Sequence, residues 1–226
     1  MTGRFIEPLQ RESTPSIIAD KIRAAIGHGE ISAGTQLVEA ELARELGVSR
    51  GPLREGLQRL TQEGLLVAIR NRGVFVIEMT PENVRDMYIA RSAVERAAAE
   101  QIFRHNPLQA ADQLLTVIDT MERPAEEHDA ARVSDADLEF HQLLVALARS
   151  PRLNRIHRTL LTETRMCLHA LEETYRESDQ RVFEHRSIAQ AFRSADPKLV
   201  DQLLVAHMDD AVARLTGGVA PELTPD

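Results

Sequence analysis

The stretch LARELGVSRGPLREGL, residues 42–57, decides the fold. Its first half predicts the end of a short helix over residues 39–46, and the Gly-Val pair that follows makes a tight turn. Ser49 can then cap another helix, and Pro52 is tolerated in the first turn of that helix. A short helix, a tight turn and a capped helix in this order predict a helix-turn-helix.

The segments on either side of this stretch extend the prediction. Isoleucines recur every four residues over residues 15–26, which indicates a helix with one apolar stripe. Downstream, two β-rich runs at residues 65–69 and 74–77 enclose the polar turn of residues 70–73, the pattern of a β-hairpin. Three helices followed by a hairpin are the layout of a winged helix-turn-helix.

After the hairpin, the pattern contains only helices. Thr80 can cap a long helix that starts at Pro81. The helices that we expect from here run over residues 81–103, 107–122, 134–149, 151–177, 180–194 and 197–216, with one of the breaks at Pro124. We therefore predict a mainly α fold, with a winged helix-turn-helix domain over residues 1–79 and an all-α antiparallel helical bundle over residues 80–226.

Composition limits the cellular setting. No apolar run approaches the ~20 residues that a membrane span needs, and the first ten residues lack the apolar stretch of a signal peptide. Cys167 is the only cysteine, which suits a reducing cytosol. The net charge is −8, but residues 1–79 carry ten basic and ten acidic side chains, so that part is neutral overall. We expect a cytoplasmic protein that has no contact with membranes and whose N-terminal part can present a locally basic face.

The helix that follows the tight turn has the features of a DNA-reading helix. Ser49, Arg50, Gly51, Pro52 and Arg54 form its first turn and a half, which is the part that such a helix aims at base edges. Arg50 and Arg54 are four residues apart and share a face, whereas the leucines point into the domain. A guanidinium can grip guanine O6 and N7 in a bidentate pair, and the helix N-terminus with the Ser49 hydroxyl can hold a phosphate.

Arg70 and Arg72 lie at the tip of the predicted hairpin, where they can reach the DNA backbone or the minor groove. The alternative interpretation is that the arginines of the helix and the hairpin are simply solvated. The order of a helix-turn-helix followed by a basic hairpin favours double-stranded DNA as the partner.

Three histidines lie on the apolar stripes of three different predicted helices. They are His141, His185 and His207, and Asp137 precedes His141 by one helical turn. One carboxylate and three imidazoles form a full ligand set for a divalent transition metal, with Zn²⁺ expected first and Ni²⁺ or Mn²⁺ possible. The alternative is that each is a hydrogen-bonded core histidine.

Arg91 lies on the apolar stripe of the long helix that starts at Pro81, where a charge is costly unless it is paired. Glu95, one turn further on, is the simple partner. The sharper hypothesis is that Arg91 receives the carboxylate of a small effector next to the metal. Arg165, beside two leucines, is a weaker second candidate for effector binding.

Residues 13–79 resemble the DNA-binding domain of the GntR family of bacterial regulators. The resemblance covers a Gly-Thr-x-Leu loop at residues 34–37, the sequence LARELGVSRGPLREGLQRLTQEGLL from residue 42, and the Arg-Gly pair at residues 72–73. It implies that Arg44, together with the serine and arginines named above, occupies a DNA-contacting position. The residues that we expect at the DNA are Arg44, Ser49, Arg50, Gly51, Pro52, Arg54, Arg70, Arg72 and Gly73. Gly51 and Gly56 depart from the family, which usually has side chains at both positions.

Residues 82–215 resemble the FCD ligand-binding domain of FadR-type members of that family. The matching pieces are Asp137-x-x-Phe140-His141, Glu184-His185-x-x-Ile188-x-x-Ala191, Asp196 and the last histidine, His207. The resemblance implies that Asp137, His141, His185 and His207 bind the metal, as in the metal-binding branch, and that the effector is an organic acid. Ser150-Pro151 stands where many relatives have Asn-Pro.

The sequence thus predicts a homodimeric transcription regulator, a repressor in the first instance, that binds a palindromic operator and responds to a small carboxylate. The rival from another class is a metalloenzyme that uses the Asp/His₃ site. Neither a carboxylate placed as a general base nor an H-E-x-x-H spacing supports that rival, so we expect no enzymatic activity. A third possibility is a regulator whose metal is only structural.

Overall fold

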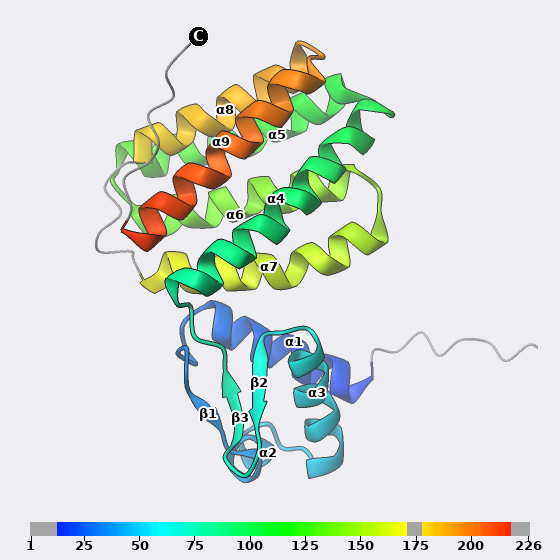
Figure 1. Ribbon diagram of the computed structural model, residues 1–226, viewed down its shortest axis with the longest axis vertical. Coiled ribbons are helices and arrows are strands. Elements are labelled where there is room, and N and C mark those ends of the chain that lie inside the picture. Colours follow the sequence, from blue (N-terminus) through cyan, green and yellow to red (C-terminus); the bar gives the residue numbers. More distant parts are fainter. Residues whose placement is uncertain (1–12, 171–177, 218–226) are drawn as a thin grey trace, which may run out of the picture.

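The computed structural model describes residues 13–170 and 178–217, and its elements form two parts stacked one above the other (Figure 1). The lower part holds α1 (Thr14–Gly27), β1 (Gln36–Leu37), α2 (Glu39–Glu45), α3 (Arg50–Gln62), β2 (Leu66–Ile69) and β3 (Gly73–Val76). The upper part holds α4 (Pro81–Phe103), α5 (Pro107–Glu126), α6 (Ala130–Leu147), α7 (Pro151–Ala170), α8 (Ser178–Arg193) and α9 (Pro197–Thr216). The mainly α fold with an N-terminal winged helix-turn-helix is confirmed. Residues 171–177, where we expected α7 to continue, lie outside the described residues.

The lower part folds around one apolar core. Ser13 caps α1 by accepting a hydrogen bond from the backbone N–H of Ser16, and the stripe of Ile18, Ile22 and Ile26 is buried. The buried leucines of α3 pack against this stripe, as does the inner end of the hairpin. Met166 of α7 belongs to the same core, so the upper part inserts a side chain into the lower one.

The sheet is small and antiparallel, with the strand order β1-β3-β2. The hairpin pairs Leu66 with Val76 and Ile69 with Gly73, so a three-residue tip remains at residues 70–72. We did not predict β1, because two residues are too few to show the alternation of a strand. Gly73 is required where β1 meets the hairpin: its φ is +112°, and a Cβ there would lie 2.8 Å from the Nε2 of Gln36.

The upper part is a helical bundle in which α5 packs against α6 and α8, and α4 packs against α7 and α9. Side-chain caps start five of its described helices: Thr80, Asn106, Asp129, Ser150 and Asp196 each accept a hydrogen bond from the backbone N–H three residues further on. Within the described ranges, no helix is both long enough and apolar enough to cross a membrane.

The predicted break at Pro124 is wrong. The helix α5 continues through Pro124 to Glu126, and α6 begins at Ala130 rather than at residue 134. Apolar contacts hold this extra turn together, because Met121 and Ala125 of α5 are fully buried against Val133 of α6. Packing therefore outweighs the backbone hydrogen bond that the proline cannot donate.

Gly56 lies where α3 crosses α1. A Cβ at Gly56 would lie 3.0 Å from the Cγ2 of Ile18 and 3.1 Å from the backbone oxygen of Pro15. Gly51 lies one and a half turns earlier on the same helix. A Cβ added there would have no neighbouring side chain or distant backbone atom within 4 Å. The unusual glycine at residue 56 is therefore explained by the close approach of two helices, whereas nothing in the packing explains the one at residue 51.

These two glycines make a matched pair of substitutions. We expect Gly56→Ala to lower the free energy of unfolding by ~1–3 kcal/mol, because α1 and α3 must move apart. Gly51→Ala should change it by less than ~1 kcal/mol, because the added methyl group meets no side chain of the fold and the gain in helix propensity is opposed by the ring of the following Pro52. Urea denaturation of both variants measures the two effects, and equal stabilisation by both would contradict the close packing.

Candidate functional site

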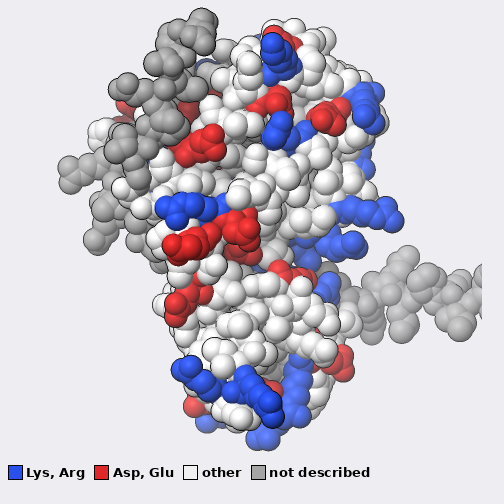
Figure 2. All heavy atoms as spheres, in the orientation of Figure 1, with Lys and Arg blue, Asp and Glu red and all other residues white. Residues whose placement is uncertain are grey.

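On the face shown in Figure 2, a group of basic side chains of the lower part lies at the end of the molecule farthest from the bundle. Ser49 is the N-cap residue of α3, but its side chain makes no capping hydrogen bond, so the hydroxyl is available to a ligand. Arg50, Gly51 and Arg54 are exposed on the first turns of that helix. The structure thus places the residues expected to contact bases on an open face.

Arg54 is not entirely unpaired. Its Nε lies 2.7 Å from a carboxylate oxygen of Glu39 on α2, while its side chain keeps 64% of its surface exposed. Arg44, Arg70 and Arg72 are exposed as well, and the guanidinium of Arg72 lies over the ring of Phe75, 5.7 Å from its centroid. A DNA base would therefore compete with Glu39 for part of the Arg54 guanidinium.

The four residues predicted as metal ligands meet inside the bundle. Asp137 and His141 come from α6, His185 from α8 and His207 from α9, and all four are buried. One possible ligand atom from each lies within 4.8 Å of the others. The Nε2 atom of His141 lies 3.1 Å from the Nε2 atoms of both His185 and His207, and that of His185 lies 3.3 Å from a carboxylate oxygen of Asp137.

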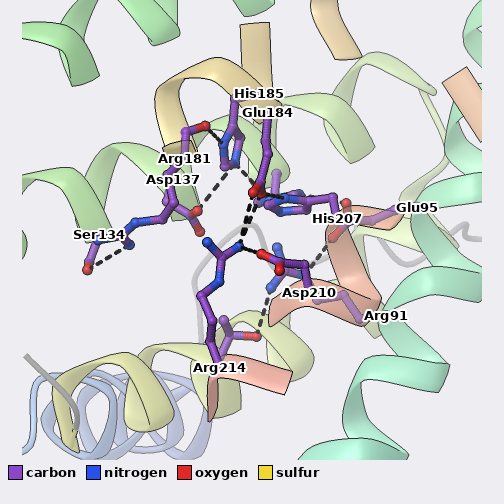
Figure 3. Close-up of polar contacts among 12 residues, drawn as sticks. Arg91, Glu95, Ser134, Asp137, Arg181, Glu184, His185, His207, Asp210 and Arg214 are labelled. Atoms are coloured by element: carbon purple, nitrogen blue, oxygen red, sulfur yellow. Dashed lines mark hydrogen bonds and ion pairs between the residues drawn. The ribbon is translucent and has the colours of Figure 1, made fainter. Parts of the chain in front are cut away.

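The Nδ1 atom of each imidazole faces a group that can only accept a hydrogen bond (Figure 3). These pairs are His141 with Glu95 at 2.7 Å, His207 with Glu184 at 2.8 Å, and His185 with the backbone oxygen of Arg181 at 2.7 Å. In each pair the imidazole must donate, so the proton of the neutral ring sits on Nδ1. Every Nε2 is then left with a lone pair that points at the shared centre.

Burial keeps the rings of His141 and His207 neutral. Burial, and next the charge of Arg91, lower the pKa of His141 to about 3, and burial also lowers the pKa of His207 below its usual value. Burial opposes ionisation of the Asp137 carboxyl, but the basic side chains around it, the guanidinium of Arg181 among them, hold its pKa well below the usual range. Neutral Nε2 atoms 3.1 Å apart, beside an ionised carboxylate, repel one another unless a cation lies among them. The donor set fits a divalent transition metal.

Arg91 and Glu95 form a buried ion pair next to this cluster. The Nε of Arg91 donates to Glu95 at 2.7 Å and its Nη1 donates to Thr164 of α7 at 3.3 Å. Its Nη2 is buried and has no hydrogen-bond partner among the described residues. His157 of α7 also contacts Glu95, at 3.0 Å. The simple partner expected for Arg91 is therefore present, and one N–H group of the guanidinium remains for a ligand.

Arg165 lies elsewhere. Its guanidinium pairs with Asp135 near the surface, and its side chain reaches toward Gly27 of α1. The structure does not bring it to the histidine cluster.

Sequence reasoning missed two carboxylates that orient the imidazoles. From the sequence we expect Glu95 only as the partner of Arg91, and Glu184 enters only through the resemblance, as the residue before His185. No spacing links Glu95 to His141 or Glu184 to His207, because each pair joins two different helices. The feature that could have indicated their role is that each is a carboxylate on a helix that faces the histidine cluster. Burial opposes ionisation of Glu95, but its contacts with His141 and Arg91 hold its pKa well below the usual range.

Two family models match the chain. The model described as "FCD domain" matches residues 86–210, which is more than half of the chain, and the model "Bacterial regulatory proteins, gntR family" matches residues 16–76. The two matches fall on the bundle and on the winged helix-turn-helix, respectively.

Whole-chain comparisons agree with these models. The chain is 27% identical over 212 residues to the "Gluconate operon transcriptional repressor" of Bacillus licheniformis, covering 92% of this chain and 87% of that protein. It is 28% identical to the "Probable D-xylose utilization operon transcriptional repressor" of Paenarthrobacter nicotinovorans, covering 93% and 94%. A crystal structure described as "a putative transcriptional regulator GntR from Rhodococcus sp. RHA1" superimposes with a TM-score of 0.74 at 27% identity, covering 92% of this chain and all of that one.

The arginines of the open face give a prediction about DNA. Arg54→Ala should cost ~1–3 kcal/mol of binding to a selected operator if the side chain reads a base. Arg72→Ala should weaken all sequences alike and flatten the salt dependence, because a phosphate contact carries no sequence information. Electrophoretic shifts with an operator selected from random DNA measure both, and Arg152→Ala on the exposed surface of α7 is the control. Unchanged affinity in both variants would contradict the assignment of this face.

The histidine cluster gives a prediction about metal content. The purified protein should carry about one divalent ion per chain, and a strong chelator should remove it with a fall in melting temperature. His185→Ala should lose the ion, whereas His105→Ala, at an exposed position on the same part of the molecule, should keep it. Elemental analysis and thermal denaturation measure these effects.

Glu184→Gln tests the role of the orienting carboxylates. An amide can turn its N–H toward Nδ1 of His207 and no longer fixes the ring, so metal affinity should fall ~10–100-fold. Competition with a fluorescent chelator measures that change. If the protein holds no metal and is fully stable in chelator, the metal prediction is contradicted and the histidines are hydrogen-bonded core residues.

Proposed function

Because the chain belongs to the GntR family of bacterial regulatory proteins, carries an FCD domain and is a transcriptional regulator, we propose that a divalent metal and a small organic acid in its helical bundle control its binding to DNA. The relatives named above are repressors of operons, so we propose repression as the mode of action. They do not support the metalloenzyme alternative.

The DNA-binding part of the proposal concerns two copies of the chain. A helix-turn-helix protein reads a palindrome by placing one such helix in each half-site, so we propose that the chain acts as a homodimer. The half-sites would lie about one DNA turn apart, ~34 Å. The operators are chromosomal, so the proposed place of action is the cytoplasm.

One observation carries the metal part. Three imidazoles, each with an acceptor at Nδ1, turn their Nε2 atoms toward one point beside the ionised Asp137. Asp137, His141, His185 and His207 would hold the ion. When bound, the metal supplies a Lewis-acidic position that can accept a carboxylate oxygen. Zn²⁺ is proposed first, because histidine nitrogen and one carboxylate suit it.

The effector part depends on Arg91. A guanidinium that is fully buried and keeps one N–H group unpaired among the described residues is suited to receive an acid. Glu95 and Thr164 hold the other nitrogens, so the direction of the guanidinium is set before the ligand arrives. We propose that the carboxylate of a small organic acid pairs with Arg91 beside the ligand cluster.

Coupling to DNA would run through the helices that hold Arg91. Arg91 lies on α4, which begins at Pro81, five residues after the hairpin strand β3 ends at Val76. Thr164, which contacts Arg91, lies on α7, and α7 packs against α1 of the DNA-binding part. An acid that draws these helices together would change the placement of the reading helices. It changes DNA affinity only to the extent that it binds the two arrangements differently.

The experiment measures operator affinity of the metal-loaded dimer with and without acids, starting with gluconate, which the name of one relative suggests. We expect a shift of ~1–3 kcal/mol, or about 5–150-fold, with the effective acid. Arg91→Lys keeps a positive charge beside Glu95 but removes the planar guanidinium with its several N–H donors. The variant should therefore bind the operator normally and lose most of the response to the acid. Arg91→Ala is less informative, because it leaves Glu95 buried without its cation.

His141→Ala should also retain operator binding and lose the response to the acid. If Arg91→Lys releases the operator at the same acid concentration as the wild type, the effector does not bind at Arg91. If metal is present and no acid from a broad panel shifts either operator affinity or melting temperature, the metal is structural and the effector proposal fails.

A further inference from the structure

A cavity of about 720 Å³ lies at the junction of the two parts, between α1 of the DNA-binding part and α6 and α7 of the bundle. A ligand there would touch both domains at once. It is distinct from the histidine cluster, none of whose four proposed metal ligands lines it.

Arginines dominate the charge of this cavity. Its lining includes Arg23 of α1 and Arg155, Arg158 and Arg165 of α7, against a single acidic side chain, Asp20. Arg165 pairs with Asp135, and the terminal nitrogens of Arg23 pair with Asp20 and Glu63. Arg23 is only 6% exposed, and its Nε is a buried donor that keeps no hydrogen-bond partner in the described part of the chain.

The two neighbouring α7 arginines are not fully engaged. Arg155 has no ion pair with any described residue, and Arg158 approaches its nearest carboxylates, those of Asp20 and Glu63, only at 3.8 and 3.9 Å. A cavity with unused guanidinium donors fits a ligand with a multiply charged anionic group, and phosphate is the group that clustered arginines bind best.

The neutral lining adds a second chemistry. Gln142 contributes an amide that can donate to and accept from hydroxyls of a ligand. The amide of Asn154 and the hydroxyl of Thr162 already donate to the backbone oxygens of Ser150 and Arg158, so their own oxygens remain to accept from ligand hydroxyls. The volume is that of a site for a metabolite rather than for an inorganic ion.

We propose that this interdomain cavity binds a phosphorylated sugar, with the phosphate on the arginines and the sugar hydroxyls on the amides and the threonine. The site is additional to the metal and acid site of the proposed function and does not depend on it.

A ligand in the cavity would contact helices of both domains. Asp20 and Arg23 lie on α1, whose isoleucine stripe packs against α3, the helix that carries the DNA-reading arginines. On the other wall, His157 lines the cavity and also contacts Glu95, the carboxylate that orients His141. A ligand held between these walls would fix the position of α1 relative to α7.

Titration calorimetry of the full-length, metal-loaded protein tests this site, with glucose 6-phosphate and fructose 1,6-bisphosphate as probes. We expect one molecule of at least one probe per chain, with glucose not binding and inorganic phosphate binding at least tenfold more weakly. The double variant Arg155→Ala/Arg158→Ala should bind that probe at least tenfold more weakly. Both side chains are exposed, so the variant should fold, and its melting temperature checks this. Arg152→Ala, another exposed arginine of α7 outside the cavity lining, should bind within twofold of the wild type.

His207→Ala separates this site from the metal centre. The variant should lose its metal and still bind the sugar phosphate, whereas loss of sugar phosphate binding there, with the double arginine variant unaffected, would overturn the proposal. Binding of neither probe, equal weakening by Arg152→Ala, or binding of inorganic phosphate as tight as that of the sugar phosphates would also overturn it.

Discussion

Three imidazole nitrogens that meet at one point, with Nε2 of His141 3.1 Å from each of the other two, place the strongest constraint on this structure. Their rings come from α6, α8 and α9, and an ionised carboxylate or a backbone carbonyl fixes each ring through Nδ1. Without a cation, the lone pairs at the centre repel one another, and the bundle would have to move these helices or protonate rings that burial keeps neutral. A bound metal would turn that repulsion into a cross-link among three helices.

The helix α7 links the functional parts of the molecule. Its His157 contacts Glu95, its Thr164 contacts Arg91 and its Met166 is buried in the core of the DNA-binding part. Side chains less than three helical turns apart thus reach the ion pair beside the proposed metal site and the base of the winged helix. A shift of α7 along its axis would move the contacts at both of these places, so the proposed coupling between ligand and DNA would use this helix.

The sequence was most informative where a pattern is local. Stripes, caps and turn residues predicted most helices within a few residues, and the resemblance of residues 42–57 to a DNA-reading segment agrees with the family to which the chain belongs. It failed at Pro124, where burial of Met121 and Ala125 against α6 outweighs a local rule. It also missed the two residues of β1, whose pairing with Phe75 and Val74 is fixed only by the tertiary fold.

The candidate site shows the same limit. Asp137 and His141 could be paired from their spacing, and His185 and His207 from their place on apolar stripes, because each is a property of one helix. The roles of Glu95 and Glu184 arise between helices, so no periodicity reveals them. The leucines near Arg165 in the sequence make it a candidate for effector binding. In the structure, however, the orientation of α7 directs its side chain toward α1 and Asp135. The sequence does not reveal which face of each helix packs against which neighbouring helix.

The proposed function requires a metal ion among the three Nε2 atoms and the Asp137 carboxylate. Anomalous diffraction from crystals of the native protein, recorded on both sides of the metal absorption edge, would locate that ion. We expect one peak per chain, ~2.0–2.2 Å from each Nε2 atom and from one oxygen of Asp137. A density map with no peak at that point, and with the imidazoles bonded to one another or to water, would contradict it.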